Sequence, residues 1–427
     1  MDGNLSHFPL MRKISIAFVV TIIAGCFAAS GAAMPGVNDL PMRKEMPDPL
    51  LVNDGTKVTN STQWVARRAE IKDILEHYSI GAMPPPPGNV TGQDLKSQLV
   101  ADGKVNFRLV HLAFGPDEKL GFDVAVFTPA GSNGPFPTFV YIGFDPTPGI
   151  AVIEPTNNPV TSTNGPPARR RVPGVSPDPD AAARRFAPEL DRGYAVVTYN
   201  YQETGDDNRG GLTNKLIAAY PAYDWHLEGA WAWGMSRVVD YLQTQPFADK
   251  SKLIAIGHSR LGKATLIAGA FDDRFAMVAP AGSGAFGTGA FRFNGMTNGG
   301  KEGLDEIIQH FPYWVGPGLP QFLGQVNKLP FDQHWLIALV APRPFISLEG
   351  IDDQFCNGNA FKESYLAAKP VYDLLGVPDR LGFNFRPGTH SLAPPDWQAA
   401  LDFADQQLRG MDVKRVFNQL PTQEQLH

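Results

Sequence analysis

Short apolar segments alternate with longer amphipathic segments from residue 193 onward. The apolar segments are rich in Val, Ile, Ala and Phe and predict buried strands, and helical periodicity follows each of them. The predicted strands are YAVVTYNY, LIAIGHS, AMVAPAG, RPFISLEG and FNFRPGTH. Strands that alternate with helices form parallel crossover units in one sheet, with helices on both of its faces.

The N-terminal part of the chain has a different pattern. Apolar residues at helical spacing predict an amphipathic helix with a buried face of Trp64, Ile71, Leu75 and Tyr78. The helix ends at Gly81, before a run of prolines. The alternating segments VNFRLVHLAF and GFDVAVFTPAG then predict antiparallel strands, and FPTFVYIGF predicts a buried strand. An antiparallel start that leads into a mainly parallel sheet is typical of the α/β-hydrolase fold.

We expect a single catalytic domain over residues 34–427. Within it, a segment at about 145–180 is rich in Pro, Asn and Gly, lacks hydrophobic periodicity and predicts an inserted loop region. Hydrophobic residues make up 43% of the chain and charged residues 19%, which allows a large core. The net charge of −6 gives no reason to expect a nucleic-acid partner.

Residues 1–33 have the pattern of an upstream extension followed by an export signal. A short basic run precedes the apolar segment Ile14–Phe27, and small residues follow it. This segment is too short and wrongly flanked for a membrane span, so we expect an exported bacterial protein: periplasmic, outer-membrane or extracellular. Ile23–Cys26 resembles a lipobox, in which Cys26 would carry a lipid anchor. The alternative is a simple signal cleaved near Ala33.

The remaining sequence gives little sign of a metal or a cofactor. Cys356 is the only other cysteine, so no disulfide is expected within the domain, and a buried structural role is favoured over thiol chemistry. No His, Cys and Asp residues have the spacing of a zinc site. Gly282–Gly287 fits G-x-G-x-x-G but lies late in the chain, which predicts a glycine-rich loop beside the active site and no dinucleotide site.

The turn after the predicted strand LIAIGHS carries the strongest chemical signal. A serine on a tight strand-to-helix turn exposes its hydroxyl as a nucleophile and directs backbone N–H groups toward an oxyanion. Ser259 follows Gly257 in this way, but the usual second glycine is replaced by Leu261, and Gly262 comes one residue late. On this pattern alone, Ser259 is either a nucleophile or a helix cap.

Chain order favours the nucleophile, because α/β-hydrolases carry the serine, the acid and the histidine in that order. His390 follows the last predicted strand, where the base belongs, and its rivals are His258 and His334. Asp352 and Asp353 follow the strand RPFISLEG, where the acid belongs. Two adjacent carboxylates cannot both face the base, and we favour Asp353 while Asp352 stays open.

The segment GHSRLGK, from Gly257 to Lys263, matches every fixed position of G-x-S-R-x-G-K. That motif is the elbow of the glucuronoyl esterases of carbohydrate esterase family 15, which the chain resembles from about Asp48 to Leu408. Further similar segments are AWAWGMSRVVDYL, PFDQHWLIALVAPRP and THSLAPPDWQAALDFAD. The shifted Gly262 is this family's form of the elbow. The resemblance implies an α/β-hydrolase that cleaves esters of the glucuronate carboxyl.

The resemblance also implies roles for individual residues. Ser259 would be the nucleophile and His390 the general base. Arg260 would stabilise the oxyanion through its backbone N–H and its guanidinium. Lys263 would hydrogen-bond the sugar hydroxyls, and its spacing from the serine places both on one helix face.

The chain departs from the family at two places. Fungal members carry the acid as a glutamate where this chain has Gly282, whereas some bacterial relatives carry it one strand later, where Asp353 stands. Phe355 replaces the tryptophan that would pack on the sugar. Glu302 is the expected second sugar-binding carboxylate, and Trp314 is the further aromatic residue expected to bind substrate.

We therefore expect a serine esterase that hydrolyses the ester between a (4-O-methyl-)glucuronate carboxyl and an alcohol, as in links between lignin and xylan. One alternative is an acetyl or general carboxylic esterase with the same fold. Another is a carbohydrate-binding relative without turnover, which the missing glutamate at Gly282 would explain.

Overall fold

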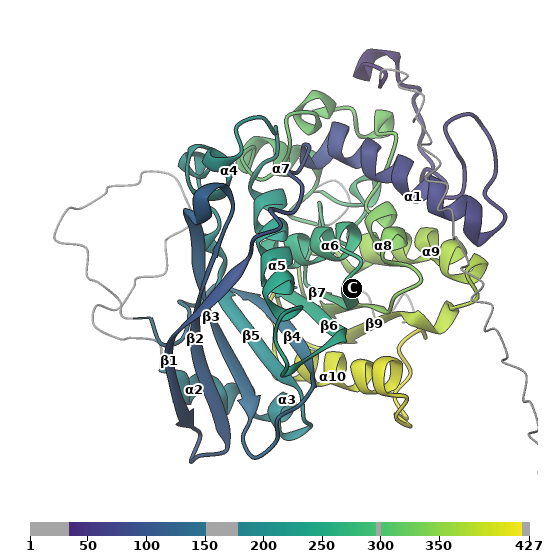
Figure 1. Ribbon diagram of the computed structural model, residues 1–427. Helices are drawn as coiled ribbons and strands as arrows, with labels where there is room; N and C mark the ends of the chain where they lie inside the picture. The colour runs from purple at the N-terminus through teal and green to yellow at the C-terminus, as the bar shows by residue number, and fades with distance from the viewer. Residues whose placement is uncertain (1–33, 151–177, 296–299, 421–427) are drawn as a thin grey trace, which may run out of the picture. The chain divides into compact units, whose positions relative to one another are not determined.

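A mixed sheet of nine strands runs through the computed structural model, which describes residues 34–150, 178–295 and 300–420 (Figure 1). The strands are β1 (Thr91–Val100), β2 (Val105–Phe114), β3 (Leu120–Pro129), β4 (Phe136–Gly143), β5 (Ala195–Asn200), β6 (Ala248–His258), β7 (Phe275–Ala281), β8 (Phe345–Gly350) and β9 (Leu381–Arg386). Their order across the sheet is β1-β2-β3-β5-β4-β6-β7-β8-β9. The pairs from β1 to β5 are antiparallel and those from β5 to β9 are parallel, which confirms the predicted α/β-hydrolase arrangement.

The edge strand β1 is a part of the sheet that the sequence pattern does not predict. Its residues, TGQDLKSQLV, are exposed except for Val100 at the end. An edge strand that is exposed on both faces shows no apolar alternation, and a lysine in it is a common protection against pairing with other chains. Backbone pairing with β2 along its whole length holds β1 in the sheet.

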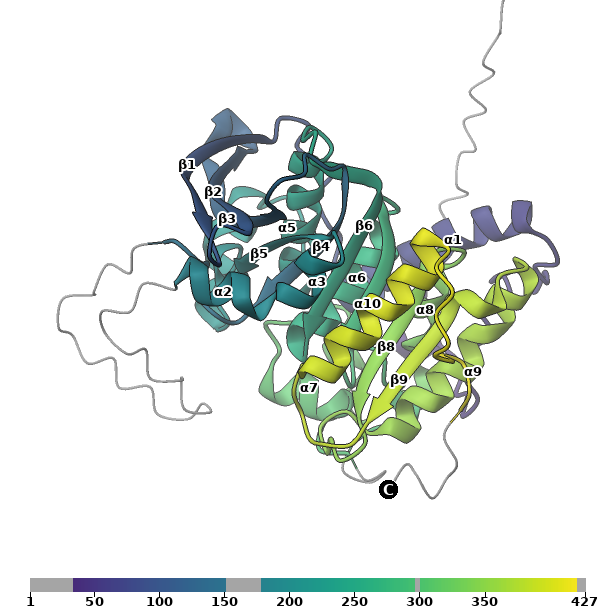
Figure 2. The same cartoon turned by 90° about the horizontal axis from the view of Figure 1, so that it is seen from below.

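Helices cover both faces of the sheet, as predicted (Figures 1 and 2). One face carries α5 (Leu227–Leu242), α6 (Arg260–Phe271) and α8 (His334–Val340), with α1 (Ser61–Leu75) and α9 (Gly358–Leu374) packed against α8. The other face carries α2 (Pro179–Arg185), α3 (Ala187–Asp191) and α10 (Pro394–Arg409). The short helices α4 (Lys215–Ala219) and α7 (Leu304–His310) lie in the connections. The sequence pattern does not predict α8, because HWLIALV is too short to show helical periodicity.

The Trp-rich helix α5 is buried along almost its whole length. It contacts α6, β4 and β6, so it supports the strand and the helix on either side of Ser259. Its indole N–H groups find backbone acceptors, since Trp231 donates to Gly205 O at 2.9 Å and Trp233 to Pro84 O at 2.8 Å. Buried Trp side chains need such partners, and the bond from Trp233 fastens the proline-rich segment to the core.

Some of the predicted features lie outside the described residues. These are the export signal with Cys26 and most of the inserted loop region at 145–180. The described residues from Pro35 on form one compact unit. Among the described helices, none is long and apolar enough to cross a membrane.

Candidate active site

Ser259 occupies a strained turn between β6 and α6. Its φ of 60° and ψ of −128° lie in a region that non-glycine residues avoid, and holding a residue there costs about 1–3 kcal/mol. Its side chain makes no capping hydrogen bond to α6, which removes the helix-cap interpretation. Its backbone N–H donates to Ala281 O of β7 at 2.8 Å, so the neighbouring strand holds the turn in place.

The shifted glycine has a steric reason. A Cβ atom on Gly262 would lie 2.8 Å from Ala281 O and 3.0 Å from Ser283 Cβ, which is closer than real Cβ contacts. The first turn of α6 therefore touches the end of β7 at position 262. Leu261 is fully buried in the core and needs no such close approach.

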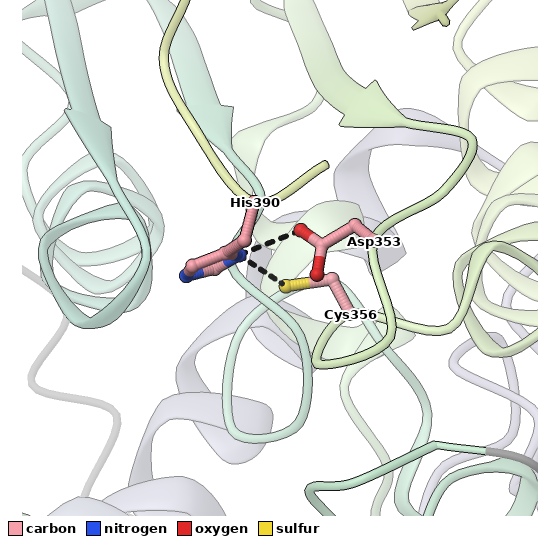
Figure 3. Close-up of side chains that lie close together, drawn as sticks. All are labelled: Asp353, Cys356 and His390. Atoms are coloured by element: carbon pink, nitrogen blue, oxygen red, sulfur yellow. Dashed lines mark hydrogen bonds and ion pairs between the residues drawn. The ribbon is translucent and has the colours of Figure 1, made fainter. Parts of the chain in front are cut away.

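His390 joins Ser259 to Asp353. Its Nε2 lies 2.8 Å from Ser259 Oγ, and its Nδ1 lies 2.6 Å from Asp353 Oδ2. His390 comes from the loop after β9 and Asp353 from the loop after β8, and Figure 3 shows the histidine and the aspartate side by side. The carboxyl ends of neighbouring parallel strands bring these loops together although their residues are far apart in sequence.

Only one of the two adjacent aspartates contacts the histidine. Asp353 Oδ1 also accepts from Phe355 N at 2.9 Å, and the side chain of Asp353 is 2% exposed. Burial tends to raise the pKa of this carboxyl, but the hydrogen bond and the charge of His390 outweigh it and the pKa is lowered. Asp352 turns away, and its Oδ2 accepts from Gly388 N at 2.9 Å.

The two rival histidines have other surroundings. His334 is fully buried, and its Nε2 is engaged by Pro47 O at 2.7 Å. The ring of His258 lies 4.5 Å from that of His390, centroid to centroid. Burial, together with the charge of His390, lowers the pKa of His258 to about 3, so the ring stays neutral at working pH.

Arg260 is held by a residue that the sequence analysis does not identify. Its Nη1 donates to Asp207 Oδ2, and Asp207 Oδ1 accepts from Trp314 Nε1 at 2.7 Å. Burial tends to lower the pKa of Arg260, but the Asp207 carboxylate outweighs it and the pKa is raised. Asp207 lies in an irregular segment between β5 and α5, where no motif marks it.

Trp314, which is predicted to bind substrate, lies against Arg260. Trp314 is 2% exposed, and its ring stacks on Phe311 with centroids 3.9 Å apart at an angle of 6°. The guanidinium carbon of Arg260 lies 5.0 Å from the centre of the same ring. The indole is thus buried between neighbours and supports Arg260, both through its ring and through the carboxylate of Asp207.

Lys263 and Glu302, which are both predicted to bind the sugar, form an ion pair. Lys263 Nζ donates to Glu302 Oε2 at 2.7 Å and to Ser283 O at 2.6 Å. An ammonium group has three N–H donors, so one donor remains for a ligand. Lys263 is 2% exposed, and it lies one helical turn after Ser259.

Phe355 has an exposed ring next to the histidine. It is 47% exposed, and its ring centroid lies 5.3 Å from that of His390. Lys301 Nζ lies 5.4 Å from the same ring. Phe355 is therefore the aromatic residue of the predicted set that offers surface to a ligand.

The glycine-rich loop Gly282–Gly287 packs beneath these side chains. Gly282 has a φ of 47°, and a Cβ there would lie 3.3 Å from His258 Nε2 and 3.4 Å from Asp353 Oδ2. The positive φ and the tight contact with His258 both disfavour a side chain at the fungal acid position.

Cys356 lies closer to the site than the sequence analysis expects. Its Sγ donates to Gly282 O at 2.9 Å and lies 3.6 Å from His390 Nδ1. Burial, with the nearby charge of Asp353, raises the pKa of this thiol well above its usual value. In the sequence, the only sign that Cys356 lies near the site is its position three residues after Asp353.

Comparison with known proteins also indicates an esterase that acts on carbohydrates. The family model "Glucuronyl esterase, fungi" matches residues 181–376. Carbohydrate esterase MZ0003, from an unknown prokaryotic organism, is 30% identical over 394 residues, which cover 86% of this chain and 90% of that protein. The 4-O-methyl-glucuronoyl methylesterase of Phanerochaete carnosa is 30% identical over 358 residues, or 81% of this chain and 76% of that protein.

A solved structure gives the same result for the fold. A promiscuous CE15 esterase from a marine bacterial metagenome superposes with a TM-score of 0.72 at 29% identity, covering 87% of this chain and 98% of the other. The sequence identity, the shared fold and the elbow motif all indicate the same family. The chain belongs to the glucuronoyl esterases of carbohydrate esterase family 15.

Proposed function

We propose that this chain hydrolyses the ester between the carboxyl group of a (4-O-methyl-)glucuronate and an alcohol, with Ser259, His390 and Asp353 as its catalytic triad. The observation that carries the proposal is the pair of hydrogen bonds by which His390 joins Ser259 Oγ to Asp353 Oδ2, at 2.8 and 2.6 Å. A base within hydrogen-bond reach and a third group that orients it are what activate a serine.

The proposed reaction has two halves. His390 Nε2 accepts the proton of Ser259 Oγ while the oxygen attacks the ester carbonyl, and the imidazolium then protonates the departing alcohol. Water, deprotonated by His390, hydrolyses the glucuronoyl-serine ester. Asp353 keeps the proton of the neutral ring on Nδ1 and stabilises the imidazolium.

Arg260 is the proposed oxyanion stabiliser. As the first residue of α6, it has a backbone N–H without an intrahelical partner, next to the nucleophile. Its guanidinium, fixed by Asp207 and by the ring of Trp314, supplies a second donor group. We assign Trp314 to positioning Arg260 and no longer to the sugar.

Lys263, Glu302 and Phe355 are the proposed substrate-binding residues. The esterified carboxyl is neutral, so polar donors and an aromatic surface can recognise the sugar without a strong positive field. Lys263 has a donor to spare, and Phe355 has an exposed ring beside the base. The predicted export signal supports action on polymeric glucuronate esters outside the cytoplasm.

The test is to measure kcat/KM on benzyl glucuronate and on an alkyl acetate, for the wild type and for Ser259→Ala. We expect the glucuronate to be strongly preferred and Ser259→Ala to lose about 10⁴-fold or more in kcat. Comparable turnover of the acetate would keep the triad but make the chain a general carboxylic esterase. No turnover of either would refute the esterase and favour a carbohydrate-binding relative.

A further inference from the structure

Asp353, Cys356 and His390 form a cluster of donor atoms in which the aspartate and the cysteine are buried and the histidine is partly exposed (Figure 3). One atom of each, a carboxylate oxygen, Sγ and a ring nitrogen, lies within 4.8 Å of the others. The bond between Asp353 and His390 belongs to the proposed triad, and the proposed ester hydrolysis routes no proton through the Cys356 thiol. The position of a cysteine beside Nδ1 of the proposed base therefore leads us to consider a further role for it.

The spacing of the sulfur and the nitrogen is that of two zinc ligands. Zinc binds sulfur at about 2.3 Å and imidazole nitrogen at about 2.05 Å, so two such ligands at a tetrahedral angle lie about 3.5 Å apart. Cys356 Sγ and His390 Nδ1 lie 3.6 Å apart. Asp353 Oδ2 lies 2.6 Å from Nδ1 and would move about 0.8 Å farther away, to the spacing of an oxygen and a nitrogen ligand on one zinc ion.

We propose that these three side chains form an inhibitory binding site for a thiophilic divalent cation such as Zn²⁺. Thiolate and imidazole ligands select zinc over magnesium or calcium. Three protein ligands leave a fourth position for water. The proposal rests on the proposed function, because it assigns the inhibition to the loss of His390 as the base.

The inhibition follows from where the protons go. In the active form His390 carries its proton on Nδ1, and Nε2 has a free lone pair for the Ser259 proton. A cation that binds Nδ1 displaces that proton to Nε2, and it displaces the proton of Cys356 to solvent. His390 then has Nε2–H, which can donate a hydrogen bond but cannot accept a proton from Ser259.

Binding can be measured without turnover. We would titrate the full chain with Co²⁺ and follow the thiolate-to-cobalt charge-transfer absorption. The wild type should gain this band with one equivalent of cobalt, and Cys356→Ala should lose it. Cys26→Ala is the matched control and should keep the band. The assay does not depend on esterase activity, so a cobalt band in an enzyme without turnover would refute the proposed function and leave the cation site standing.

Inhibition is measured on benzyl glucuronate with increasing Zn²⁺. We expect the wild type to lose activity and to regain it with a chelator, and Mg²⁺ to have no effect. Relative to each variant's own metal-free rate, Cys356→Ala and Cys356→Ser should need at least about tenfold more zinc for half-inhibition.

Several results would overturn the proposal: no cobalt band in the wild type, a band that Cys26→Ala removes, or equal zinc sensitivity in the wild type and the Cys356 variants. A cobalt band without any inhibition would also overturn it, because the ion would then leave Nδ1 free. If neither Cys356 variant folds, His390→Ala provides the cobalt test, and a band that survives it excludes this site.

Discussion

Asp353 Oδ2 lies 2.6 Å from His390 Nδ1, while the adjacent Asp352 gives its Oδ2 to Gly388 N at 2.9 Å. The two carboxylates therefore contact the same loop at different places. Asp353 orients the ring of His390, and Asp352 holds the backbone of the loop two residues before His390. Neighbours of identical chemistry with different partners offer a matched pair of variants.

We expect Asp353→Asn to lower kcat on benzyl glucuronate by about 10³–10⁴, because an amide no longer stabilises the imidazolium and favours the wrong ring tautomer. Asp352→Asn keeps an oxygen that can accept from Gly388, so its kcat should change by less than about threefold. Thermal unfolding of both variants checks that the loop is intact. Equal losses in the two variants would contradict the assignment of Asp353 as the acid.

The contact between Asp207 and Arg260 leads to a second prediction. Loss of one oxyanion donor costs about 10²–10³ in kcat, and Asp207 acts only by orienting such a donor. We expect Asp207→Asn to lower kcat by about tenfold, with KM little changed. The measurement is a full kinetic profile on benzyl glucuronate, because an effect on stability alone would leave kcat of the folded enzyme intact.

Asp206 provides the control for this variant. Its carboxylate binds Lys215 at 2.8 Å and Asn214 at 2.8 Å, away from Arg260. Asp206→Asn should leave kcat within about twofold of the wild type. A similar loss in both variants would mean that the segment as a whole, and not the Arg260 contact, supports activity.

The sequence predicts most of this fold and the central site residues because their signals are local. A buried strand, a Gly-x-Ser turn and a loop at a strand end each occupy a few consecutive residues. Chain order then fixes His390 and an aspartate after β8, and the geometry of the two loops separates Asp353 from Asp352.

The remainder depends on contacts that no short segment contains. Asp207 reaches Arg260 across 53 residues, and Cys356 reaches His390 across 34. The sequence marks Trp314 only by its residue type, whereas its stacking on Phe311 and its closeness to Arg260 appear only in the folded chain. β1 was missed because its exposed edge position removes the alternation that marks a strand.

The ion pair of Lys263 and Glu302 should affect both substrate binding and the stability of the fold. Each partner is largely buried, so the loss of one leaves an unpaired charge and costs about 3–5 kcal/mol of stability. We expect Lys263→Met to raise KM for benzyl glucuronate by about 10–100-fold, as for a lost hydrogen bond to a charged donor. The readouts are KM and the free energy of unfolding.

The double variant Lys263→Met/Glu302→Gln distinguishes the two effects. It removes both charges, so much of the lost stability should return while KM stays high. If KM recovered together with stability, the pair would be a structural element and Lys263 would not contact the sugar.

The last prediction concerns Glu349 at the end of β8, which is fully buried beneath the glycine-rich loop. Its Oε1 accepts from Ser347 Oγ at 2.5 Å and from Thr288 Oγ1 at 3.2 Å. Burial raises the pKa of this carboxyl from 4.5 to about 8. The folded state thus keeps a proton that the unfolded chain releases, so this group's contribution to stability is complete below pH 4.5 and is lost as the pH rises to about 8.

Glu349→Gln should remove this part of the pH dependence, because the amide is neutral at every pH and its oxygen can still accept both hydrogen bonds. Urea unfolding between pH 4.5 and 8 should show the wild type losing up to about 1.4 kcal/mol per pH unit relative to the variant. Buried Glu189, whose pKa burial raises to about 7, contributes a slope to both proteins and cancels in the comparison. Glu45→Gln, at an exposed position, should keep the wild-type slope. Parallel curves for the wild type and Glu349→Gln would mean that Glu349 is ionised in the folded protein across this range.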